Sequence, residues 1–202
     1  MTVFQLNGAT TSTAVDGKLP LVHVLRNPCD AKDVRFGCGA GNCGACTVIV
    51  DGVAQQSCGL STESIEGCDV FTPAALQGDP IGAVVLQAFL DEQAAQCGYC
   101  INGMVMMAAA LLAREPNPSE ADVRRELSGN LCRCGTHIEI VHAVVGGIAS
   151  GDNTRTGNTA YRCGHKAIIK QDPACDQSVN IRRFYGAVFI VTSKCGGALI
   201  VR

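Results

Sequence analysis

The chain has 202 residues, of which 47% are hydrophobic and 17% charged, with 23 glycines and no tryptophan. Its length suits one large domain or two small ones, and its composition is typical of a folded protein rather than a disordered or fibrous one. A formal net charge of −2 argues against nucleic-acid binding, which needs a basic face. No apolar stretch approaches the roughly 20 residues that cross a bilayer. Residues 1–25 show no export signal, so we expect a cytoplasmic protein.

The first 78 residues are predicted to form a small α+β domain in which a sheet is crossed by one helix. Two hairpins are expected, each around a two-residue turn of Asn or Asp followed by Gly. Their strands and turns are residues 3–6, 7–8 and 11–15, then residues 46–50, 51–52 and 53–58. The second hairpin would return Cys58 to the side of Cys46. A short helix at residues 21–26 and a strand at residues 69–72 complete the domain.

Residues 79–150 change to helical periodicity, and four helices are predicted there. They cover residues 81–96, residues 102–114, a stretch opened by a capping-box pattern at residues 119–122, and residues 137–149. The apolar faces of the first and last helices are expected to hold Val84, Val85, Ala88, Phe89, Ile138, Val141, Val145 and Ile148. Met104, Met106 and Met107 are expected to fill the core rather than bind metal.

Residues 151–202 form a tail of different composition, with 8 basic and 3 acidic residues and a net charge of +5. Residues 1–150 carry 8 basic and 15 acidic residues, a net charge of −7. Only residues 187–192 are strand-like, and Cys163-Gly-His165 is too isolated to indicate a metal site. One hypothesis is that this unassigned tail is an out-of-register or vector-derived translation, which the intact mass of the mature protein decides.

Thirteen cysteines, without an export signal, indicate metal binding rather than a disulfide framework. The first cysteine group reads Gly37-Cys38-Gly-Ala-Gly-Asn-Cys43-Gly-Ala-Cys46, followed by Cys58. This is the plant-type spacing for one [2Fe–2S] cluster, in which four thiolates surround two irons. The interleaved glycines let the loop take positive φ and turn its N–H groups toward the sulfurs.

The second cysteine group comprises Cys97-Gly-Tyr-Cys100 and Cys132-Arg-Cys134. Taken alone, this group leaves zinc as an alternative, although a zinc ribbon usually shows two C-x2-C pairs. A thioredoxin-type redox pair would leave the C-x-C half without a role. Among the remaining cysteines, Cys29 and Cys68 are expected to be free, small apolar residues of the core.

Three segments resemble signatures of the small iron–sulfur subunit of the xanthine dehydrogenase and aldehyde oxidase family of molybdenum hydroxylases. They are residues 37–47, 96–103 and 129–136, and the resemblance covers roughly residues 1–149. Residues 91–96 and 126–137 look most similar to the nicotinate dehydrogenase and isoquinoline 1-oxidoreductase branch. The resemblance implies an N-terminal β-grasp, plant-type ferredoxin-like domain at residues 1–78 and a four-helix [2Fe–2S]-binding domain at residues 79–150.

The resemblance also implies which residues bind the cofactors. One [2Fe–2S] cluster would be held by Cys38, Cys43, Cys46 and Cys58, and the other by Cys97, Cys100, Cys132 and Cys134. In this family the second of these clusters lies nearer a molybdopterin that is bound by a separate large subunit. Gln96 matches the glutamine that hydrogen-bonds the pterin, and Cys134 matches a ligand cysteine close to it. A surface amide is the alternative for Gln96.

No Ser–His–Asp or paired-carboxylate arrangement stands out, and the histidines are expected to be structural. The implied function is to pass electrons from the molybdenum centre through both clusters during hydroxylation of an N-heteroaromatic substrate such as nicotinate. The favoured acceptor is a c-type cytochrome or haem domain, the alternative is a flavin subunit, and any membrane association would come through the partner. Two other function classes stay open: a free-standing ferredoxin-type carrier and a zinc-stabilised interaction module.

Overall fold

The computed structural model describes residues 1–149, 180–182, 189–192 and 198–201. The chain divides into two units, residues 1–162 and residues 163–202. In the second unit, three antiparallel strands form a sheet in the order β6-β7-β8. They are β6 (Asn180–Arg182), β7 (Phe189–Thr192) and β8 (Ala198–Val201). The strand expected at residues 187–192 is thus confirmed over its last four residues, while Cys163, His165, Cys175 and Cys195 lie outside the described residues.

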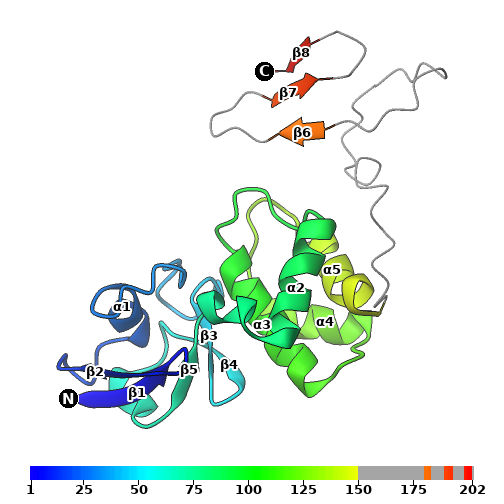
Figure 1. Ribbon diagram of the computed structural model, residues 1–202. Coiled ribbons are helices and arrows are strands. Elements are labelled where there is room, and N and C mark those ends of the chain that lie inside the picture. The colour runs from blue at the N-terminus through cyan, green and yellow to red at the C-terminus, as the bar shows by residue number, and fades with distance from the viewer. Residues whose placement is uncertain (150–179, 183–188, 193–197, 202) are drawn as a thin grey trace. The chain divides into compact units, whose positions relative to one another are not determined.

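The first unit begins with a five-stranded mixed sheet in the order β2-β1-β5-β3-β4, crossed by helix α1 (Figure 1). Strands β1 and β5 are parallel, and the other neighbours are antiparallel. The elements are β1 (Thr2–Leu6), β2 (Ala9–Thr13), α1 (Leu21–Arg26), β3 (Thr47–Val50), β4 (Val53–Gln56), the 3-10 turn η1 (Thr62–Ile65) and β5 (Asp69–Phe71). The predicted α+β domain is confirmed.

Both predicted hairpin turns are present, with positive φ at both central residues of each turn. Such a turn matches the twist of the flanking strands. Because the first turn holds only two residues, pairing resumes at once opposite Leu6. Strand β2 therefore begins at Ala9, and the return strand expected at residues 11–15 was placed two residues too late.

The first turn also contacts the end of the sheet domain. Asn7 accepts a hydrogen bond at Oδ1 from the Thr72 N–H (2.8 Å) and donates from Nδ2 to Thr72 Oγ1 (3.0 Å). Thr72 is buried and directly precedes the 3-10 turn η2 (Pro73–Gln77). In η2, the side chain of Leu76 packs in the core of the following helices. The connection between the two halves is therefore fixed at both ends, and the boundary at residue 78 stays a prediction.

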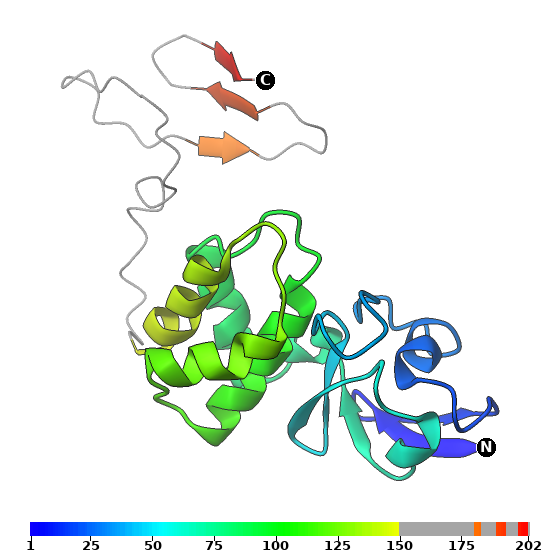
Figure 2. The same cartoon turned by 180° about the vertical axis from the view of Figure 1, so that it is seen from behind.

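Four helices follow, as predicted (Figure 2). They are α2 (Pro80–Asp91), α3 (Ile101–Arg114), α4 (Glu120–Glu126) and α5 (His137–Ala149), with a 3-10 turn η3 (Leu127–Gly129) after α4. Met104 and Met106 are fully buried and Met107 packs against the same core, which confirms their predicted role. Two predicted core positions are wrong, since Val84 is 48% and Ile138 is 58% exposed. No helix in the described parts of the chain has the length and apolar character to cross a membrane.

Cys29 and Cys68 pack at the edge of the sheet domain's core, which is built mainly on α1 and the sheet. Both are free and half-buried, and burial raises the pKa of the Cys29 thiol. Their predicted role as small apolar residues is confirmed, although neither is fully buried.

Helix α2 ends five residues before the predicted end at residue 96. Gln93 adopts a left-handed φ of 49° and donates its N–H to the Leu90 carbonyl, while the Ala94 N–H donates to the Phe89 carbonyl. This pair of bonds is a Schellman motif, which satisfies the last carbonyls of a helix. Glycine usually occupies the left-handed position, so the sequence carried no stop signal there.

Changing Gln93 to glycine is expected to raise the free energy of unfolding by about 0.5 kcal/mol, because glycine adopts the left-handed region without a Cβ penalty. Urea unfolding followed by helical circular dichroism measures the change. Gln87→Gly, at an exposed position inside the same helix, is the matched control and should lower stability by about 1 kcal/mol. Loss of stability in both variants would contradict the expectation.

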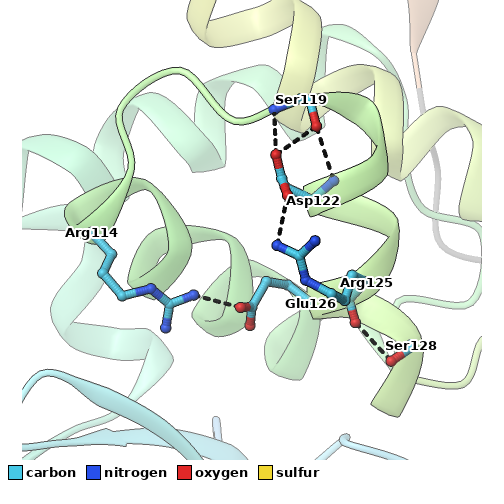
Figure 3. A network of polar contacts seen from close by, with 6 residues as sticks. All are labelled: Arg114, Ser119, Asp122, Arg125, Glu126 and Ser128. Carbon is cyan, nitrogen blue, oxygen red and sulfur yellow. Dashed lines mark hydrogen bonds and ion pairs between the residues drawn. The ribbon is translucent and has the colours of Figure 1, made fainter.

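Helix α4 begins with the predicted capping box, drawn in Figure 3. Ser119 Oγ accepts the Asp122 N–H (3.2 Å), and Asp122 Oδ2 accepts the Ser119 N–H (3.2 Å). Farther along, Arg125 pairs with Asp122, and Arg114 of α3 pairs with Glu126 (2.5 Å). The cap satisfies N–H groups at the helix start, and the Arg114–Glu126 pair joins α4 to α3.

The change Ser119→Ala is expected to lower the unfolding free energy by about 1 kcal/mol, since it leaves the Asp122 N–H without its partner. Thermal unfolding of the purified protein measures this. Ser128→Ala removes a serine that bonds only to the Arg125 carbonyl at the other end of the helix, and it should change stability less. Equal losses in the two variants would contradict a capping role.

Candidate iron–sulfur sites

Cys38 is an exposed thiol surrounded by backbone donors. Its Sγ accepts hydrogen bonds from the N–H groups of Ala40 (3.4 Å) and Asn42 (3.2 Å), and its own N–H donates to Cys43 Sγ (3.3 Å). The bonds from Ala40 and Asn42 lower the pKa of Cys38 to about 6. At neutral pH this sulfur is a thiolate, which is the form that binds iron.

Cys46 and Cys58 lie on the buried side of the same loop. The Cys58 N–H donates to Cys46 Sγ (3.4 Å), as expected if the β3–β4 hairpin returns the chain to this point. The Gly41 N–H donates to Cys58 Sγ (3.3 Å). Burial raises the pKa of Cys46 to about 11, so iron binding at this sulfur must displace a proton.

Glycines shape this loop in two ways. Gly41 has a φ of +73°, and in this conformation its N–H reaches Cys58. At Gly37 the reason is space, because a Cβ there would lie 2.5 Å from Cys43 Sγ. The expected role of glycine in turning N–H groups toward sulfur is therefore met at Gly41, and Gly37 serves close approach instead.

The second cysteine group lies at the starts of two helices. Cys97 and Cys100 immediately precede α3, and Cys132 and Cys134 immediately precede α5. Helix N-termini carry partial positive charge and favour thiolates. The Tyr99 N–H, the largest contribution, lowers the pKa of Cys97.

The thiols of the second group form two pairs. Cys97 is hydrogen-bonded to Cys134, and Cys100 to Cys132. Burial and the bond to Cys132 raise the pKa of Cys100 to about 12. Burial raises the pKa of Cys132 as well, but bonds from Thr136 and Cys100 bring it down to about 7. The Cys132 N–H donates to His137 Nε2 (3.2 Å), which gives this histidine a structural role.

The first group is paired in the same manner, Cys38 with Cys43 and Cys46 with Cys58. Within the described residues, no three His, Cys, Asp or Glu side chains are grouped so that they could hold one metal ion. A [2Fe–2S] cluster instead places two cysteine sulfurs on each of its irons. Eight sulfurs in four pairs therefore fit two such clusters, whereas a zinc ion needs four ligands at a single point.

The two cysteine loops are also bonded to each other. The Leu131 N–H donates to the Cys43 carbonyl (3.0 Å), and Gln56 Nε2 donates to the Gly129 carbonyl (3.4 Å). Tyr99 Oη donates to the Phe36 carbonyl. The sequence analysis missed these residues, although Tyr99, Gly129 and Leu131 lie inside the cysteine motifs.

Gln96 is exposed and directly precedes the exposed Cys97. Cys134, the partner of Cys97, is half-buried. These residues stand on the open side of the second group, while Cys100 and Cys132 pack against the helical core.

The fold and the four sulfur pairs define a protein that carries two iron–sulfur clusters in successive domains. Residues 4–70 match the 2Fe-2S iron-sulfur cluster binding domain, and residues 72–145 match the [2Fe-2S] binding domain. The iron–sulfur chain of nicotinate dehydrogenase from Pseudomonas putida is 50% identical over 140 residues, which cover 69% of this chain and 89% of that protein. The alpha chain of isoquinoline 1-oxidoreductase from Brevundimonas diminuta is 43% identical over 146 residues, covering 71% of this chain and 95% of that protein.

Among solved structures, a chain of quinoline 2-oxidoreductase from Pseudomonas putida 86 superposes with a TM-score of 0.69 at 32% identity, covering 74% of this chain and 93% of that one. The chain belongs to the small iron–sulfur subunits of the xanthine dehydrogenase and aldehyde oxidase family of molybdenum hydroxylases. It carries two [2Fe–2S] clusters and transfers electrons for a large, molybdopterin-binding partner subunit. The zinc module and the free-standing carrier are thereby set aside.

Proposed function

We propose that electrons leave the molybdopterin centre through the second cysteine group and then pass to the first. The proposed ligands are Cys97, Cys100, Cys132 and Cys134 for the entry cluster, and Cys38, Cys43, Cys46 and Cys58 for the exit cluster. The pairing of all eight sulfurs, two for each iron, carries this assignment. The exposed Gln96 and the half-buried Cys134 are proposed to lie nearest the pterin, because they form the open side of the second group.

When bound, each [2Fe–2S] cluster accepts and releases one electron at a time, so two in series can receive the two electrons of a hydroxylation stepwise. The chain supplies position and potential. Backbone N–H groups of Ala40, Gly41 and Asn42 point at the sulfurs of the first group. Such bonds stabilise the added negative charge and raise the reduction potential. The first group is therefore suited to draw the electron onward.

The substrate and the acceptor belong to this proposal. Relatives are named for nicotinate and isoquinoline, and a related structure for quinoline, all N-heteroaromatic compounds. We take a substrate of this class, such as nicotinate, to be the one hydroxylated on the partner. A c-type cytochrome or haem domain is the proposed acceptor, and the alternative is a flavin subunit. The cytoplasmic location, with membrane association only through a partner, also remains a prediction.

The test is to purify the complex from its native host without dissociating it. We expect about four irons per chain, two distinct [2Fe–2S] signals in electron paramagnetic resonance after dithionite reduction, and molybdenum in a large subunit that co-elutes. Zinc in place of iron, or a single signal, would contradict the cluster assignment. Haem or flavin in the same preparation would identify the acceptor.

A further inference from the structure

Three parts of the chain meet at Gly44, which lies between Cys43 and Cys46. A Cβ on Gly103, in the first turn of α3, would stand 1.9 Å from the Gly44 carbonyl oxygen. A Cβ on Gly44 would stand 2.4 Å from Asn130 Nδ2. The first cysteine loop, helix α3 and the segment before Cys132 are thus packed without room for one added methyl group.

Asn130 is 3% exposed and connects these parts by hydrogen bonds. Its Nδ2 donates to the Gly44 carbonyl (3.3 Å). Its backbone is extended, with φ −112° and ψ 119°, and the following N–H, that of Leu131, donates to the Cys43 carbonyl (3.0 Å). The next residue is Cys132, so two bonds link one cysteine loop to the residues directly before a ligand of the other.

The bond from Asn130 is not needed to satisfy the Gly44 carbonyl. That oxygen already accepts hydrogen bonds from the Thr47 N–H (3.2 Å) and from Thr47 Oγ1 (2.7 Å). Removing the amide therefore leaves no orphaned acceptor, and the usual energetic reason for a buried polar side chain is absent on that side. What the amide adds is a link between two loops that are 86 positions apart in the chain.

We propose that Asn130 is a positioning residue that fixes the separation and orientation of the two clusters. This inference rests on the proposed function. The magnetic dipolar interaction between two reduced clusters falls with the cube of their distance, and electron transfer falls more steeply still. A loop held from both sides at Gly44 keeps that distance single-valued, whereas a loop held only by α3 samples a range.

The experiment compares the complete complex with Asn130→Leu, which keeps the volume, and Asn130→Ala. Asn27→Ala, an exposed asparagine after α1, is the matched control. Iron content and the low-temperature resonance spectrum of the fully reduced complex are measured. We expect unchanged iron in all variants, a resolved splitting between the two cluster signals in the parent and the control, and loss of that splitting in both Asn130 variants.

An unchanged splitting in Asn130→Leu, or a parent complex with two signals and no splitting, would overturn the positioning role. Loss of a cluster in both Asn130 variants would also overturn it, because the residue would then be needed for cluster binding itself. A parent complex with fewer than two [2Fe–2S] signals would instead overturn the proposed function. Reduction potentials of the two clusters, measured in the same samples, should shift by less than the splitting changes.

Discussion

Changing Cys132 to alanine is expected to remove about two of the roughly four irons per chain and to abolish one of the two [2Fe–2S] signals. Cys100 would lose its paired sulfur, and a cluster iron with one cysteine ligand is not held. Electrons from the partner would then stop at the molybdenum centre. Substrate should still reduce molybdenum in a single turnover, while the remaining cluster stays oxidised, as rapid-freeze resonance measures.

Cys29→Ala is the matched control for this change. Cys29 is half-buried against the sheet domain's core and belongs to neither group. It should keep the full iron content and both signals. Full iron in Cys132→Ala, or a cluster lost in Cys29→Ala, would contradict the ligand assignment.

Gly103→Ala is expected to lower the unfolding free energy by about 3 kcal/mol, because the new methyl group overlaps the backbone of the first cysteine loop. The overlap is with the Gly44 carbonyl, at 1.9 Å, and a backbone atom cannot turn aside as a flexible side chain can. Either α3 or the loop must shift. Urea unfolding and iron content of the purified complex measure the two consequences, and the first-group signal should be the one that weakens.

The comparison for this substitution is Gly146→Ala, also within a helix. A Cβ on Gly146 in α5 would meet nothing within 4 Å. Alanine should therefore stabilise that helix, by about 0.5–1 kcal/mol. If both variants lost stability equally, the tight contact between α3 and the loop would not be the cause.

Local patterns were enough to predict the hairpins, the helical half and both cysteine groups. The Asp51-Gly52 turn alone places Cys58 beside Cys46, since a two-residue turn fixes the register of the strands it joins. The spacing of Cys38, Cys43 and Cys46 requires one loop to enclose the cluster. These features depend on residues that are close together in the chain.

The rest depends on contacts between distant segments. Nothing near Asn130 in the sequence indicates that its amide meets Gly44, and Gly103 reads as a weak helix residue until its neighbour is known. The early end of α2 at Gln93 uses a residue type that rarely marks a helix stop. Val84 and Ile138 follow the apolar periodicity but lie on the exposed side, because periodicity does not show how far a buried face extends.

The bonds between Asn7 and Thr72 bear on the order in which the protein is made. All four cysteines of the first group precede Thr72, and all four of the second group follow it. Chains leave the ribosome N-terminus first, and domains generally fold as units during synthesis. The ferredoxin-like half can therefore close around its own four thiols, with Asn7 bonded to Thr72, while the helical half is still being translated. Iron delivery can follow the same order as translation.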